Sequence, residues 1–121
     1  MQTGAKTYGK VARATGSQRS LEADLLLMAA SRLQAIHDSW DAKRVDLDAA
    51  LRYNRKLWTI FLSEVTSSTN PLPAEIRQNV ANLGLFVMKH TISVLTDPQP
   101  RQLNSLISIN RELAAGLRGA A

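Results

Sequence analysis

The sequence predicts an all-α protein: a compact bundle of about four main helices with a short basic N-terminal arm or helix. Apolar residues recur three and four positions apart in four stretches, two proline-containing segments separate the later stretches, and no stretch predicts a strand. The chain of 121 residues suffices for one domain with a single core. This helical domain should span residues 21–121, with helices near residues 21–41, 47–67, 74–95 and 101–116.

Residues 1–20 form a segment that is rich in Gly, Thr and Ser. Its four bases, with no acid among them, are Lys6, Lys10, Arg13 and Arg19. Apart from Met1, its sizeable apolar side chains are those of Tyr8 and Val11, and such a segment buries too little surface to offset its ordering entropy alone. We expect either a basic arm in solvent or a short helix that docks through Tyr8.

The first predicted helix begins at Ser20, a residue suited to the N-cap, with Glu22 and Asp24 in the first turn. Its apolar stripe recurs at alternating spacings of three and four and consists of Leu26, Ala29, Leu33, Ile36 and Trp40.

Asp46 is placed to cap the second helix. The predicted buried face of this helix consists of Leu47, Ala50, Leu51, Leu57, Trp58, Phe61, Leu62 and Val65. Asn54 lies in the middle of that face. A buried amide without a partner costs about 1–3 kcal/mol, so we expect Asn54 to bond a neighbouring loop or helix end and to fix how the helices meet.

The third helix has the most apolar surface, because its apolar residues cover more than half of its circumference. We therefore expect it to be the central helix, contacted by several neighbours. Pro73 can occupy its first helical position, and Asp97-Pro98 marks its end.

The fourth helix follows a stiff connection in which Pro100 can open the helix. Its apolar stripe consists of Leu103, Leu106, Ile107, Leu113, Ala114 and Leu117. Asn110 lies inside this stripe, as Asn54 does in the second helix.

The sequence contains no typical arrangement of catalytic or metal-binding residues. There is no cysteine, and the two histidines, His37 and His90, form no His-x-x-x-His or His-Glu pair. We find no glycine-rich phosphate loop, no Ser-His-Asp set and no pair of carboxylates on an apolar face. We expect no metal, no cofactor and no enzyme activity, and a protein that acts by binding a partner.

The longest apolar run, residues 25–30, is far shorter than the roughly 20 residues that span a bilayer. The N-terminus lacks the apolar segment of a signal peptide. These features predict a cytoplasmic protein with no membrane partner.

The net charge of +5 is distributed unevenly. Residues 1–19 carry four bases and no acid, whereas residues 20–121 carry eleven bases and ten acids. Because the folded part is nearly neutral, few residues are available for a basic nucleic-acid-binding face. The composition therefore disfavours nucleic acid as a partner.

Four motifs in the second half of the chain resemble those of a known family. They are NRKLW at 54–58, NPLPAEIR at 70–77, FVMKHT at 86–91 and LISINR at 106–111, followed by Gly116-Leu117. Tyr8 and Glu22 also fit the start of that family. The chain thus resembles the flagellar biosynthesis regulator FlaF family, small bacterial proteins needed for flagellin production.

The resemblance implies a role in flagellin synthesis and export, alongside FlbT, a second regulator that acts on flagellin messenger RNA. The leading hypothesis is a chaperone-like adaptor that binds flagellin in the cytoplasm and couples its synthesis to its secretion. Apolar anchors of the client would enter a groove between helices. The alternative is a direct post-transcriptional regulator that holds flagellin messenger RNA through the four N-terminal bases.

Candidate site residues come from the apolar side chains that lie outside the main stripes. These candidates for partner binding are Tyr53, Ile60, Phe86 and Ile109. They either widen the core or line a groove for flagellin. Structural roles are expected for Asn54, Trp58, Pro73, His90 and Asn110.

Overall fold

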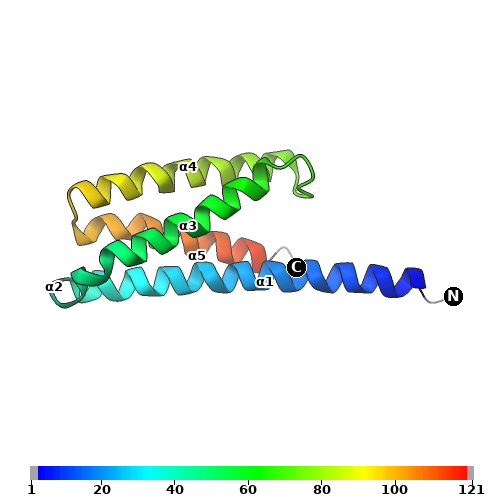
Figure 1. Ribbon diagram of the computed structural model, residues 1–121, viewed down its shortest axis with the longest axis horizontal. Helices are drawn as coiled ribbons and strands as arrows, with labels where there is room; N and C mark the ends of the chain where they lie inside the picture. Colours follow the sequence, from blue (N-terminus) through cyan, green and yellow to red (C-terminus); the bar gives the residue numbers. More distant parts are fainter. Residues whose placement is uncertain (1–2, 120–121) are drawn as a thin grey trace.

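A computed structural model describes the backbone of residues 3–119 and the side chains of residues 18–119. Within these residues the chain is all-α, without a strand, which confirms the predicted fold class (Figure 1). The long helices are α1 (Thr3–Asp38), α3 (Leu47–Thr66), α4 (Ala74–Thr96) and α5 (Leu103–Gly119). Shorter pieces connect them: the helix α2 (Trp40–Lys43) and the 3₁₀ turns η1 (Arg44–Asp46) and η2 (Pro100–Gln102).

The four long helices form a bundle in which some pairs of helices pack along a greater length than others. α1 packs along α5 and α3, and α3 also packs along α4, whereas α4 and α5 approach each other over a shorter length. The largest fully buried apolar side chains come from α1, α3, α4 and α5, and are Leu26, Leu33, Leu51, Trp58, Val87, Val94, Leu103 and Leu106. As a result, α3 connects the α1–α5 pair to α4.

α4 is not the central helix of the bundle, so the prediction from its apolar circumference was wrong. It buries one narrow stripe, with residues four, three, four and three positions apart: Val80, Gly84, Val87, Thr91 and Val94. Ile76, Leu85, Ile92 and Leu95 remain between 41% and 60% exposed. The apolar part of a helix shows how much surface can be buried, but not whether neighbours are present to bury it.

Gly84 lets α4 come close to α3. A Cβ atom at this position would lie 2.5 Å from Cδ2 of Leu62 and 2.7 Å from its Cγ. Carbon atoms normally pack about 3.5–4.0 Å apart, so a larger residue would push the two helices away from each other.

The predicted start of the first helix near Ser20 was also wrong. α1 begins at Thr3 and continues without interruption through Ser20 to Asp38, so the N-terminal segment is the beginning of this helix. Glu22 therefore lies inside a helix, where Gln18 Nε2 donates to its Oε1 at 3.1 Å. The side chains of Lys6, Tyr8, Lys10 and Arg13 lie outside the described part of the chain.

The helix ends agree with the predicted breaks to within a few residues. Asp46 is at the N-cap of α3, but its side chain makes no capping hydrogen bond. Pro73 is the N-cap of α4 and not its first helical residue, and Asn70 Oδ1 accepts from the Leu72 amide at 3.0 Å just before it. Pro100 opens η2, which leads directly into α5.

Candidate functional site

An exposed apolar surface lies on a side of α4 that no other described helix covers. Leu85 is 57% exposed, Ile92 60% and Leu95 41%, while Ala81 and Met88 are partly buried. These residues are four, three, four and three positions apart, which is the spacing of a coiled-coil seam. We call this surface the α4 stripe: Ala81, Leu85, Met88, Ile92 and Leu95. It could pair with a second amphipathic helix.

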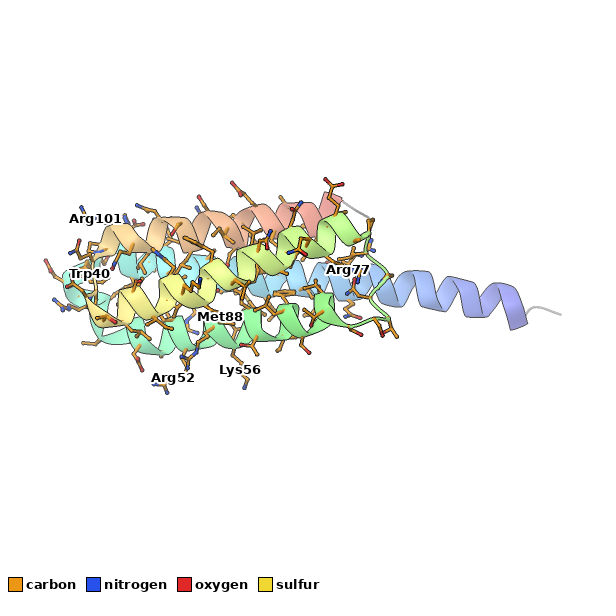
Figure 2. The ribbon with its side chains drawn as sticks, turned by 90° about the horizontal axis from the view of Figure 1, so that it is seen from above. Trp40, Arg52, Lys56, Arg77, Met88 and Arg101 are labelled. Atoms are coloured by element: carbon orange, nitrogen blue, oxygen red, sulfur yellow. The ribbon has the colours of Figure 1, made fainter. Side chains whose placement is uncertain are left out.

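Bases flank the α4 stripe on two helices. Lys89 is exposed on α4, and Arg52, Arg55 and Lys56 are exposed on α3. Figure 2 shows Met88 where α4 adjoins α3, with Arg52 and Lys56 projecting from α3. Arg52 pairs with Asp48 one turn earlier on the same helix. A partner helix with acidic residues beside its apolar seam would match this surface in both shape and charge.

A second apolar surface is a hollow of about 200 Å³ at one end of the bundle. Its apolar lining comes from α3, α4, α5 and the turn before α4, and consists of Phe61, Val65, Leu72, Val80, Leu113 and Leu117. Its polar lining consists of Gln18, Arg19, Glu22, Glu64 and Asn70. Burial raises the pKa of Glu64, and the neighbouring Glu22 carboxyl raises this pKa further. We call this surface the end hollow.

The four predicted partner-binding residues do not form one groove. Tyr53 is partly buried on α3, with the Arg32 guanidinium of α1 5.4 Å from its ring centre. Ile60 follows two turns later on the same side of α3 and is 49% exposed. These two residues therefore line the junction of α3 with α1.

Phe86 and Ile109 lie at a different junction, that of α4 with α5. Phe86 is 43% exposed and stacks on His90, with ring centres 5.1 Å apart. His90 contacts Ser105 on α5. Because α4 and α5 are antiparallel, Phe86, one turn before His90, lies opposite Ile109, one turn after Ser105. Ile109 is partly buried. The four predicted residues are therefore divided between two junctions.

Three of the predicted structural residues form one buried hydrogen-bonded network. Trp58 Nε1 donates to Asn110 Oδ1 at 2.9 Å, and Asn110 Nδ2 donates to Asn54 Oδ1 at 2.7 Å. Asn110 Nδ2 also lies 3.4 Å from the carbonyl oxygen of Leu26. The network joins α3, α5 and α1, whereas we had expected Asn54 to bond a loop or helix end. Asn54 Nδ2 has no partner among the described residues.

His90 connects α4 to the segment that begins α5. Its Nε2 lies 2.7 Å from the carbonyl oxygen of Gln102, to which it donates, and 3.2 Å from Ser105 Oγ. Since α4 and α5 otherwise have limited contact, this hydrogen bond holds the end of α4 in place. The expected structural role of His90 stays a prediction.

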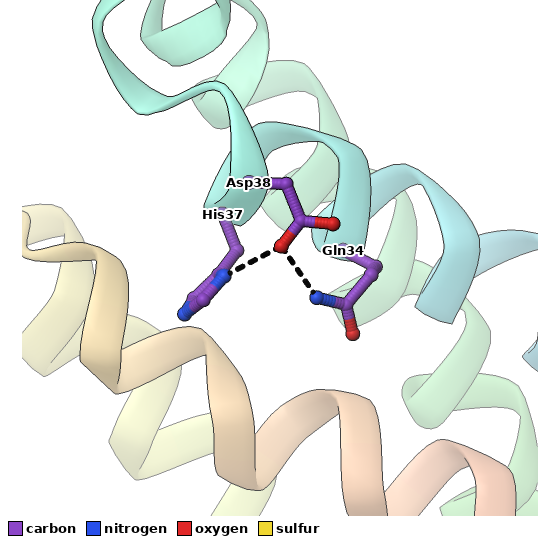
Figure 3. A network of polar contacts seen from close by, with 3 residues as sticks. All are labelled: Gln34, His37 and Asp38. Carbon is purple, nitrogen blue, oxygen red and sulfur yellow. Dashed lines mark hydrogen bonds and ion pairs between the residues drawn. The ribbon is translucent and has the colours of Figure 1, made fainter.

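A small polar cluster lies at the end of α1 (Figure 3). His37 Nδ1 is 3.0 Å from Asp38 Oδ1, and Gln34 Nε2 donates to the same oxygen at 2.9 Å. These two hydrogen bonds, first that of His37 and then that of Gln34, lower the pKa of Asp38. All three side chains come from the last turn of one helix and border solvent, and they form no enclosed site.

The described residues contain no group of three or more His, Asp or Glu side chains that could hold a metal ion. None of their helices combines the length and the apolar composition needed to traverse a membrane.

Sequence reasoning missed the α4 stripe as a candidate binding surface, because the large apolar residues of this helix other than Phe86 were assigned to the core. The seam spacing of its five residues was visible in the sequence. A second seam at the same spacing, containing Val80 and Val87, lies beside it, and the sequence does not show which of the two faces α3.

Comparison with known proteins adds the identity of the family. The family model described as "Flagellar protein FlaF" matches residues 4–117, which extends the resemblance from the second half of the chain to α1. Searches of curated proteins and of solved structures found no match. Because the family model covers nearly the whole chain, this protein belongs to the FlaF family of flagellar proteins.

Proposed function

We propose that this protein is a regulator of flagellum biogenesis that binds flagellin in the cytoplasm and couples its synthesis to its secretion. In this proposal it is an adaptor without enzyme activity or cofactor, and an amphipathic helix of flagellin docks on the α4 stripe. The observation that carries the proposal is the exposed seam formed by Leu85, Ile92 and Leu95. Membership in a family of flagellar proteins supports flagellin as the client.

The size of the α4 stripe favours reversible binding. Covering an aliphatic side chain that is about half exposed contributes on the order of 1 kcal/mol. The three most exposed residues together therefore supply roughly 3 kcal/mol, less than the ~4 kcal/mol of a millimolar complex. Further contacts, including those of Lys89 and the α3 bases with acidic residues of the client, must add to this energy. A client that has to be released for export fits such a surface.

Isothermal titration calorimetry with purified flagellin tests the proposal. The variant Leu85→Glu/Ile92→Glu places two charges on the stripe, so we expect at least tenfold weaker binding at an unchanged melting temperature. Val45→Glu is the matched control, because Val45 is 82% exposed and lies in η1, away from α4. The proposal is wrong if the double variant binds flagellin as tightly as the control does.

The alternative, direct binding of flagellin messenger RNA through the N-terminal bases, is tested with the same protein. RNA binding that uses several phosphates weakens steeply with salt, whereas binding to an apolar surface does not. Salt-sensitive binding of a flagellin messenger RNA leader, lost on Lys6→Ala/Lys10→Ala/Arg13→Ala, would favour this alternative. FlbT serves as a third ligand, because it is the other partner that the family resemblance suggests.

A further inference from the structure

The N-terminal part of α1 extends beyond the rest of the bundle. In Figures 1 and 2 it projects past the α3–α4 turn and past the end of α5, and no other described element lies beside it. Residues 3–17 would form a rod about 22 Å long at 1.5 Å per residue. A helical rod of this length offers a large surface for a partner.

This extension is a poor helix on its own. It contains Gly4, Gly9 and Gly16, each of which disfavours a helix by about 1 kcal/mol relative to alanine. It also lacks acids that could pair with Lys6 and Lys10 one turn away. Isolated helices of this length are marginal in water even for favourable sequences. The extension therefore needs a surface to pack on.

The end hollow opens where α1 leaves the bundle. Gln18, Arg19 and Glu22 follow the extension directly on α1 and line the end hollow. With Glu64 opposite, the lining carries two carboxylates and one guanidinium and is therefore acidic. Burial disfavours the charge of Glu64 and raises its pKa, and the nearby Glu22 carboxyl raises this pKa further. A cation brought to this position would relieve the repulsion.

The extension carries the complementary charge. Its bases include Lys6, Lys10 and Arg13, and it has no acid. If two extensions lie antiparallel and cross near residue 12, the beginning of each extension reaches the end hollow of the other chain. Position 6 of one copy then lies opposite position 18 of the other, so the start of this basic stretch comes beside the end hollow, which carries the Glu22 and Glu64 carboxylates.

We propose that two copies of this chain associate through antiparallel pairing of the N-terminal parts of α1, with each extension reaching the end hollow of its partner. This dimer uses the extension and the end hollow, which share no residue with the α4 stripe, and does not depend on flagellin binding. It gives the extension a packing partner and brings the start of its basic stretch to the carboxylates of the end hollow. A dimer would also present two α4 stripes to a client.

Sedimentation equilibrium of the full chain tests the association. We expect a monomer–dimer equilibrium, with at least a tenfold larger dissociation constant for Glu22→Gln/Glu64→Gln. Asp41→Asn/Asp97→Asn is the matched control, because it removes two exposed carboxylates at the end of the bundle opposite the end hollow. A full chain that sediments as a monomer up to millimolar concentration overturns the proposal, as does an equal effect of the two variants.

The geometry is tested by cysteine crosslinking, which is specific because the native chain has no cysteine. A mixture of Lys6→Cys and Gln18→Cys should give a crosslinked heterodimer in high yield, whereas Lys6→Cys alone should give little. Predominant Lys6–Lys6 crosslinking indicates parallel pairing and contradicts the proposal. Adding flagellin should leave the Lys6–Gln18 crosslink in place. Its loss would show that flagellin is the true occupant of this surface.

Discussion

The indole Nε1 of Trp58 donates a hydrogen bond of 2.9 Å to Oδ1 of Asn110, 52 positions later in the chain. Both residues are fully buried, and the amide of Asn110 continues the network to Asn54 and to the backbone of α1. Three helices thus meet at one polar point inside an apolar core. Buried polar groups require specific partners, so this network favours one arrangement of the helices over others of similar apolar contact.

Trp58→Ala should lower the free energy of unfolding by about 3–5 kcal/mol, because it removes a fully buried aromatic side chain. Trp58→Phe keeps most of the packing but leaves Asn110 Oδ1 without its donor, so it should cost about 1–3 kcal/mol. Urea denaturation followed by circular dichroism measures both values. A midpoint for Trp58→Ala equal to that of the parent would show that this side of α3 does not support the core.

Asn110→Leu should cost more stability than Asn54→Leu. Asn110 makes hydrogen bonds to Trp58 and Asn54 and lies near the Leu26 carbonyl, whereas Asn54 accepts one bond and leaves its own Nδ2 without a partner among the described residues. We expect about 1–3 kcal/mol for Asn54→Leu and a larger loss for Asn110→Leu. The reverse order in urea denaturation would contradict this description of the network.

Gly84→Ala should lower the melting temperature, because the added Cβ atom would overlap the Leu62 side chain. Overpacking of this kind typically costs about 1–3 kcal/mol. Combining it with Leu62→Ala removes the overlap, so the double variant should lose less stability than the two single effects predict. Additive effects in calorimetry would mean that the two residues are not in contact.

The four candidates for partner binding should differ in stability. Ile60→Ser and Phe86→Ala alter residues that are 49% and 43% exposed, so both variants should stay close to the parent melting temperature. Tyr53→Ala and Ile109→Ser alter partly buried residues packed against the core and should melt earlier. If one of these residues extends the flagellin-binding surface beyond the α4 stripe, its variant should weaken flagellin binding while keeping the parent stability. Calorimetric titration of each variant with flagellin, together with its melting curve, separates a loss of affinity from a loss of stability. Parental affinity in all four variants would exclude these residues as anchors.

Glu64→Gln should make the protein more stable at neutral pH. The pKa of Glu64 is raised above its usual value of 4.5, so the folded state disfavours the ionised carboxylate. The stability of the parent therefore falls as the pH rises from 4.5 through the raised pKa. The glutamine variant does not lose this stability, because its amide does not ionise. Melting curves from pH 4 to pH 8 should separate as the pH rises. Curves that separate instead toward low pH would show that the shift has the opposite sign.

The positions of α3, α4 and α5 could be predicted from the sequence, because the periodicity of apolar residues and the proline-containing breaks are local properties of the chain. α3, α4 and α5 begin within about two residues of the predicted positions. The sequence also indicated that Asn54 and Asn110 lie on apolar faces. It did not show that they bond each other, because this contact depends on how α3 and α5 are placed in space.

The tertiary structure alone decided which apolar surfaces are covered. α4 carries two seams of the same spacing, and only the one containing Val80, Val87 and Val94 is buried along its length. In the other seam, Ala81 and Met88 pack against the core, whereas Leu85, Ile92 and Leu95 remain exposed. The α4 stripe remains exposed because α3 and α5 lie on other sides of the helix. The start of α1 at Thr3 could not be predicted from the sequence either. Ser20 is a good N-cap, and the glycine-containing segment before it does not predict a helix. Local patterns determine what each segment can form, whereas burial depends on neighbours that are distant in the sequence.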